Sequence, residues 1–176
     1  MIMTAQENDV RPVLSRTPSI LRALLEESPA AAVDFHEKEG AWSPVQVLCH
    51  LAHGEVTDWM ARVELILAPG DSNRFTPFDR EGGFVRYAGW TASRLLDEFD
   101  KLRASNLARL DAFNITEADL RRTAVHPDLG PVTLGQLLAC WATHDLAHIE
   151  QITRGLVRYL GPAVGPWRKY FSLLSD

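Results

Sequence analysis

Apolar residues recur at helical spacing in four segments of the chain, and turn-forming residues separate these segments. The third segment shows the pattern most clearly, as LLDEFDKLRASNLARL at residues 95–110. No run of alternating apolar and polar residues is long enough to predict a strand. The pattern therefore predicts an all-α fold with helices over residues 17–28, 43–68, 91–113 and 133–159.

Residues that favour the start of a helix precede three of these segments. Thr17 is a suitable N-cap and is followed by proline at the first helical position. Ser43 and Thr133 each have glutamine three residues later, which is the capping-box arrangement. Pro69, followed by glycine, predicts the end of the second helix.

Four helices in a chain of 176 residues predict a single domain, residues 1–176, built as an antiparallel four-helix bundle. Prolines after the fourth helix predict a short C-terminal segment that includes WRKYFSLL at 167–174. The loop at 69–90 is longer than the connections of about 2–8 residues that bundles use, so we expect it to be functional or mobile.

The charge balance and composition exclude several classes of protein. The formal net charge is -5, from 18 basic and 23 acidic residues, which predicts neither nucleic-acid binding nor binding to a membrane surface. No apolar run reaches the roughly 18 residues of a transmembrane helix, and residues 1–12 do not resemble a signal peptide. We therefore expect a cytoplasmic protein in which Cys49 and Cys140 are reduced thiols.

Two histidines in the stretch HDLAH, His144 and His148, lie one helical turn apart. They fall at the edge of the apolar face of the fourth predicted helix, beside Gln151. Side chains four residues apart can reach the same ion, which favours a shared metal. The same spacing is compatible with core packing, so the metal hypothesis requires a third ligand from elsewhere in the chain.

His50 is the candidate for that third ligand. It lies on the second predicted helix, away from the main apolar face of that helix. The residues that share its face are small, namely Gly54, Thr57 and Ala61, so a metal and a small ligand could occupy the space beside it. His53 points roughly 60° away from His50 and is expected to face the pocket or solvent.

Asp145 projects near the middle of the apolar face of the fourth helix, where an unpaired carboxylate would be costly. One interpretation makes Asp145 a catalytic residue that orients a ligating histidine or acts as a general base, with Glu55 and Asp58 behind it. The other interpretation makes it a structural carboxylate bound to a loop backbone or to an arginine.

Four further candidates have simpler interpretations. Cys140 lies one turn before His144 and could be a third ligand, but we expect both Cys140 and Cys49 to be packed thiols. His36 and His126 occur in polar stretches and are expected to be solvated.

Taken together, these motifs resemble the DinB-like superfamily, a group described as metal-dependent hydrolases or thiol transferases. The matching stretches are WSPVQVLCHLAHGE at 42–55, FDRE at 78–81, HPDLGPVTLGQLLACWATHDLAHIEQI at 126–152 and VGPWRKYF at 164–171. The resemblance covers most of the chain and implies a four-helix bundle of up-down-down-up topology.

The resemblance also implies a metal site. His50, His144 and His148 would bind a divalent metal, with zinc or nickel as the first choices and iron or another metal as alternatives. Three histidine ligands leave a coordination position open, which is typical of a catalytic site. The implied activity is transfer of a low-molecular-weight thiol, such as bacillithiol, mycothiol or glutathione, to an electrophilic small molecule. Arg80 and Arg86 of the long loop could contact such an anionic cosubstrate.

Two other functions remain open at this stage. One is hydrolysis of a small molecule by a metal-activated water, and the other is a non-catalytic, metal-stabilised binding or stress-response module. Homodimers are common in the family, so the resemblance implies a homodimer as well.

Overall fold

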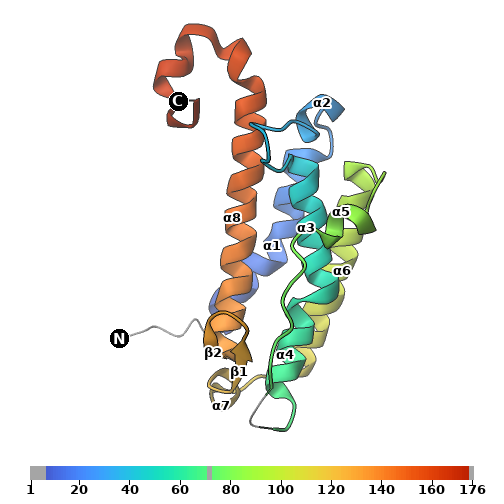
Figure 1. The fold of residues 1–176 in the computed structure, drawn as a ribbon, viewed down its shortest axis with the longest axis vertical. Helices are drawn as coiled ribbons and strands as arrows, with labels where there is room; N and C mark the ends of the chain where they lie inside the picture. Colours follow the sequence, from blue (N-terminus) through green and yellow to red (C-terminus); the bar gives the residue numbers. More distant parts are fainter. Residues whose placement is uncertain (1–6, 71–72, 175–176) are drawn as a thin grey trace.

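The computed structural model describes residues 7–70 and 73–174. In this part of the chain, a bundle of long helices confirms the all-α four-helix fold predicted from the sequence (Figure 1). The bundle consists of α1 (Glu7–Leu25), α3 (Pro44–Thr57) with its continuation α4 (Trp59–Leu67), α6 (Ala92–Ala112) and α8 (Leu134–Leu160). The expectation about a signal peptide falls partly on residues 1–6, which lie outside the described residues.

Short elements connect and flank the bundle. The short helices are α2 (Ala30–Val33), α5 (Gly82–Arg86), α7 (Glu117–Leu120), η1 (Gly161–Tyr170) and η2 (Ser172–Leu174). A two-stranded antiparallel hairpin, β1 (Thr123–His126) and β2 (Gly130–Thr133), precedes α8. The sequence pattern does not predict this hairpin, because strands of four residues are too short to show a clear alternation.

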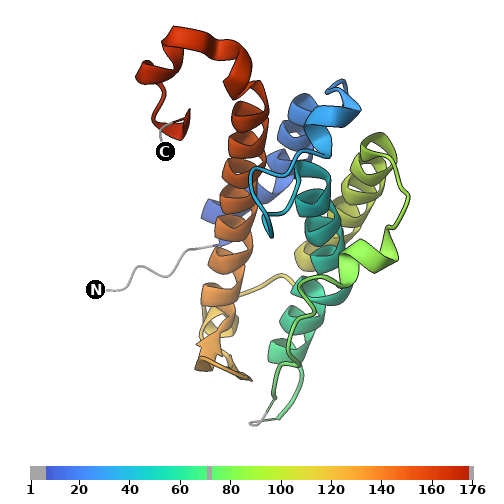
Figure 2. The same ribbon diagram turned by 45° about the horizontal axis from the view of Figure 1, so that its top comes forward.

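The helices α1 and α8 run in one direction, and α3, α4 and α6 run in the other (Figure 1). The neighbouring pairs α1–α6 and α3–α8 are therefore antiparallel, whereas α1–α8 and α3–α6 are parallel. The expected antiparallel packing holds for two of these four pairs. Because α4 and α6 follow each other in the same direction, the chain between them has to return along the whole bundle (Figure 2). This topology explains the length of the segment between them.

The helix starts at Ser43 and Thr133 are confirmed, since each side chain accepts from the backbone N–H three residues later within a capping box. The start at Thr17 is wrong, because α1 begins at Glu7 and Pro18 lies inside it. Proline cannot donate to the carbonyl four residues earlier, which here belongs to Leu14. That carbonyl accepts instead from the Nη1 atom of Arg103 at 2.8 Å, so the long-range contact compensates for the missing helical bond.

The second predicted helix is interrupted at Asp58, whose φ of -120° and ψ of -70° separate α3 from α4. The sequence predicts one continuous helix over 43–68, and its end before Pro69 is confirmed. The conformation of Asp58 interrupts the regular helical rotation at this residue, so that the residues after it are not placed as in one straight helix.

Arg103 on α6 connects all four long helices through buried hydrogen bonds. Its Nη1 atom donates to the backbone oxygen of Leu14 on α1 and to Asp145 Oδ2 on α8, at 2.8 and 2.6 Å. Its Nη2 atom donates to Glu55 Oε1 on α3 and to Asp145 Oδ1, at 2.8 and 3.0 Å. The side chain is 1% exposed, and it lies between the Phe99 ring of one apolar cluster and the Trp141 ring of the other.

Two neutral groups complete this network. Asn106 donates to Glu55 Oε2 at 3.0 Å, and the indole nitrogen of Trp141 donates to Glu55 Oε1 at 3.0 Å. Burial alone would lower the pKa of Arg103, but the charges of Glu55 and Asp145 outweigh it and raise this pKa. One buried guanidinium therefore serves two buried acidic side chains.

The C-terminal segment, η1 and η2, packs on α8, where the Leu174 side chain lies against Gly161. Trp167, Tyr170 and Phe171 on this segment are exposed. Among the described residues, no helix combines the length and apolar character that crossing a membrane would need. That residues 1–176 form a single domain stays a prediction.

Replacing Arg103 with methionine should lower the free energy of unfolding by about 3–5 kcal/mol, because it leaves two buried carboxylates without their cation. Arg22→Met is the matched control, since Arg22 pairs with three carboxylates, one more than Arg103, but does so at the surface. Its loss should cost about 1 kcal/mol or less. Urea unfolding followed by circular dichroism measures both values, and equal losses would contradict the central role of Arg103.

Candidate metal centre

Three histidine rings from two helices meet at one point of the bundle. His50 comes from α3, and His144 and His148 come from α8, one turn apart. The Nε2 atom of His144 lies 3.0 Å from Nε2 of His50 and 3.1 Å from Nε2 of His148. One nitrogen from each ring lies within 4.8 Å of the other two. The structure thus brings together the three histidines that the sequence suggested as ligands.

Hydrogen bonds at the opposite ring nitrogens fix the protonation of two of these rings. His50 Nδ1 lies 2.9 Å from the carbonyl oxygen of Arg80, which can only accept. His148 Nδ1 lies 2.8 Å from the side-chain oxygen of Gln151, which is also an acceptor. Both Nδ1 atoms must therefore donate, so that in each neutral ring the Nε2 atom carries a lone pair.

This arrangement fits a cation better than it fits hydrogen bonding among the rings. His144 can donate one hydrogen from Nε2, but two lone pairs face that atom. At least one close contact between nitrogens therefore has no hydrogen in it. Two imidazole nitrogens that bind one zinc ion tetrahedrally lie about 3.3 Å apart, given bonds of about 2.0–2.1 Å. The observed separations are close to that value, so the three rings can hold a divalent metal ion.

Burial keeps the three rings in the neutral form that a metal requires. It lowers the pKa of His50 to about 4 and the pKa of His144 to about 2, and it also lowers the pKa of His148. The positive charge of Arg80 adds to each of these shifts. All three imidazoles are therefore neutral at pH 7 and available as ligands.

A cavity of about 400 Å³ opens beside the three histidines. Asp58 and Arg62 line its wall, and the Arg62 Nε atom lies 2.7 Å from Asp58 Oδ1. Burial raises the pKa of Asp58 to about 6, although the charge of Arg62 opposes the shift. Asp58 can therefore exchange a proton near neutral pH, in the same cavity as the imidazoles.

The glycine at position 83 allows the segment that supplies the Arg80 carbonyl to lie close to α3. A Cβ atom on Gly83 would lie 2.5 Å from the backbone oxygen of Cys49, so no larger residue fits there without a shift of backbone. The neighbouring Phe78 ring packs against His50, with ring centroids 5.4 Å apart. The 69–90 loop thus contributes directly to the orientation of a candidate ligand.

Asp145 contacts Arg103 through both carboxylate oxygens, and no hydrogen bond joins it to a histidine among the described residues. Of the two interpretations from the sequence, its contacts match the carboxylate paired with an arginine. A role as general base is not supported, because Asp145 is fully buried and does not line the cavity.

The remaining candidates lie outside the group of three. His53 is buried and packs against Phe78, but it is not part of the cluster. Cys49 is buried, and burial raises the pKa of its thiol to about 11, as expected for a packed cysteine. Cys140 is exposed, so the expectation that it is packed in the core is wrong.

His126 and Asp58 line the cavity, and the sequence predicted neither position, although it named Asp58 as a carboxylate behind Asp145. His126 was expected to be solvated, yet it is half-buried at the end of β1 and lines the cavity beside the three histidines. Its position depends on the unpredicted hairpin. Asp58 lies at the break between α3 and α4 and lines the cavity. The sequence feature that could have indicated its role is a carboxylate within an otherwise apolar helical pattern.

Comparison with known proteins agrees with the fold. None of the curated proteins matches this chain. Among solved structures, YfiT from Bacillus subtilis is similar, with 25% sequence identity and a TM-score of 0.75. The similarity covers 92% of this chain and 91% of YfiT, which is described as "a probable metal-dependent hydrolase with an unusual four-helix bundle topology".

The family model of the DinB superfamily matches residues 14–152. This range contains all four long helices apart from the ends of α1 and α8, and it includes the three clustered histidines. The resemblance seen in the sequence motifs is therefore confirmed, and the chain belongs to the DinB superfamily.

Proposed function

We propose that this protein is a metal-dependent enzyme that hydrolyses a small molecule, with His50, His144 and His148 as the metal ligands. The observation that carries the proposal is the convergence of three Nε2 atoms, two of which must present lone pairs. The likeness to YfiT supports it further. Zinc and nickel are the first candidates for the ion, because both accept neutral imidazole ligands.

The chain supplies the other parts of a hydrolytic site. A divalent ion held by the three rings would act as a Lewis acid and lower the pKa of a water molecule. Asp58 accepts the proton of the attacking water at a carboxylate oxygen, and Arg62 holds that carboxylate in place. The Arg80 carbonyl and Gln151 keep the His50 and His148 rings in the ligating orientation.

Transfer of a low-molecular-weight thiol is the second candidate, and a second cavity favours it. This cavity, of about 760 Å³, adjoins the metal centre and shares Phe78, Arg80 and His148 with the first. It offers room for a cosubstrate next to the reacting molecule. In this alternative, Asp58 would accept the thiol proton instead of a proton from water.

The purified protein should bind about one divalent ion per chain. His144→Ala should weaken metal binding by more than about 100-fold, and Gln151→Ala by about 10–100-fold, because Gln151 only orients a ligand. His53→Ala is the matched control, since His53 is buried on the same helix as His50 but lies outside the cluster. Elemental analysis and competition with a chromogenic chelator measure these affinities. Unchanged metal binding in His144→Ala would rule out the proposed ligand set.

Asp58→Asn should lower kcat/KM for ester hydrolysis by about 10²–10⁴-fold while the metal content stays unchanged. With p-nitrophenyl esters as probes, the wild-type rate should rise as the pH increases through about 6, because Asp58 must be ionised to accept a proton. Asp128→Asn is the control, since Asp128 is an exposed carboxylate on the wall of the same cavity.

Three outcomes of this assay separate the candidate functions. Hydrolysis that survives Asp58→Asn would remove Asp58 from the mechanism. Turnover that requires added glutathione, with 1-chloro-2,4-dinitrobenzene as the electrophile, would replace hydrolysis by thiol transfer. A protein that binds metal but turns over neither probe set would favour the non-catalytic binding module.

The homodimer implied by the family resemblance is part of the proposal. The exposed side chains of Trp167, Tyr170 and Phe171 on the C-terminal segment support it, because exposed aromatic clusters are typical of interfaces. Light scattering after size-exclusion chromatography should give twice the chain mass of 19.7 kDa, and Trp167→Ser with Phe171→Ser should give the monomer. A wild-type monomer at high concentration would contradict the dimer.

A further inference from the structure

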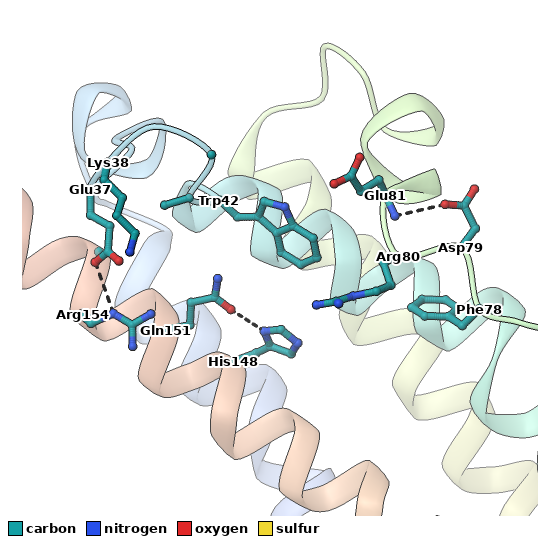
Figure 3. Close-up of a pocket in the computed structure, with 13 residues that line it drawn as sticks. Glu37, Lys38, Trp42, Phe78, Asp79, Arg80, Glu81, His148, Gln151 and Arg154 are labelled. Carbon is teal, nitrogen blue, oxygen red and sulfur yellow. Dashed lines mark hydrogen bonds and ion pairs between the residues drawn. The ribbon is translucent and has the colours of Figure 1, made fainter. Parts of the chain in front are cut away.

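Arg80 has an unusual position between the two cavities. It lines both of them, and its guanidinium lies 5.7 Å from the centre of the Trp42 ring. Figure 3 shows its side chain projecting into the larger cavity, between Trp42 and His148. The backbone of the same residue orients His50. One residue thus positions a candidate ligand and places a cation next to it.

The guanidinium of Arg80 has no acidic partner among the residues that the structure describes. Its neighbours in the chain, Asp79 and Glu81, point away from it (Figure 3), and Asp79 Oδ1 accepts instead from the backbone nitrogens of Glu81 and Gly82. Arg154, on the opposite wall, is already paired with Glu37 at 3.3 Å. Of these two arginines, Arg80 alone remains available to an anion.

The composition of the larger cavity limits the charge of that anion. The formal charge of its wall is close to zero, because three basic residues (Lys38, Arg80 and Arg154) are balanced by three acidic residues (Glu37, Asp79 and Glu81). A single free guanidinium in such a setting matches a monoanion better than a dianion. A planar carboxylate also fits the two parallel N–H donors of an arginine. Trp42 and Phe78 provide apolar walls beside it.

We propose that the larger cavity is the substrate chamber and that Arg80 binds a carboxylate group of an aromatic or apolar substrate, next to the metal centre. The proposal rests on the proposed function, because it assigns a substrate class to the same site. The further proposal goes beyond the proposed function by naming a carboxylate as the substrate group that the chain recognises. The substrate would lie between Trp42 and Phe78 with its carboxylate directed to Arg80.

Calorimetric titration of the full-length protein with benzoate, benzamide and phenyl phosphate tests this assignment. Benzoate should bind about tenfold more tightly than the neutral benzamide, as expected for one charge-assisted contact. Arg80→Gln should abolish this preference without loss of metal, because the backbone carbonyl that orients His50 remains. Arg86→Gln is the matched control, since Arg86 belongs to the same segment but lines neither cavity.

Titrations of metal-free protein separate this inference from the proposed function. The preference for benzoate should persist without metal, so that a failed metal site would not prevent its detection. In the metal-loaded protein, a benzoate preference that survives Arg80→Gln but disappears in His144→Ala would place the carboxylate on the metal. That result would overturn the inference and leave the proposed metal centre standing. Tighter binding of phenyl phosphate, or no binding of benzoate to the metal-free wild type, would overturn it as well.

Discussion

The packing of this bundle depends on the buried guanidinium of Arg103. One side chain on α6 bonds to a backbone carbonyl on α1, a carboxylate on α3 and a carboxylate on α8. Because each of these contacts has a defined direction, they fix the relative register of the helices in a way that apolar packing alone does not. Pro18 belongs to the same arrangement, since it leaves the Leu14 carbonyl free to accept from Arg103.

The metal centre is adjacent to this network along the chain. Asp145 directly follows His144 on α8, within the turn that carries two of the ligands, and Glu55 lies on the helix of His50. Trp141 joins the two regions, because it donates to Glu55 and stacks on Trp59, whose ring meets the edge of His144. The carboxylates that bind Arg103 and the candidate metal ligands therefore lie on the same two helices, α3 and α8.

The sequence predicted the parts of the molecule that local rules determine. The capping boxes placed the starts of α3 and α8, and the spacing in HDLAH placed His144 and His148 on one face. Prediction from the sequence failed where contacts between residues far apart in the chain determine the structure. The start of α1 could not be predicted because the partner of Leu14 lies 89 positions away, and the partner of Asp145 lies 42 positions away. The break at Asp58 and the approach of His126 likewise depend on tertiary packing.

The central claim is that three imidazoles hold one divalent ion. X-ray absorption spectroscopy of the zinc- or nickel-loaded protein tests it most directly, because it reports the type and distance of the atoms around the metal. The account predicts nitrogen ligands at about 2.0–2.1 Å with the outer-shell scattering of imidazole rings that fits three histidines. Sulfur scattering at about 2.3 Å, or a spectrum without imidazole contributions, would contradict it.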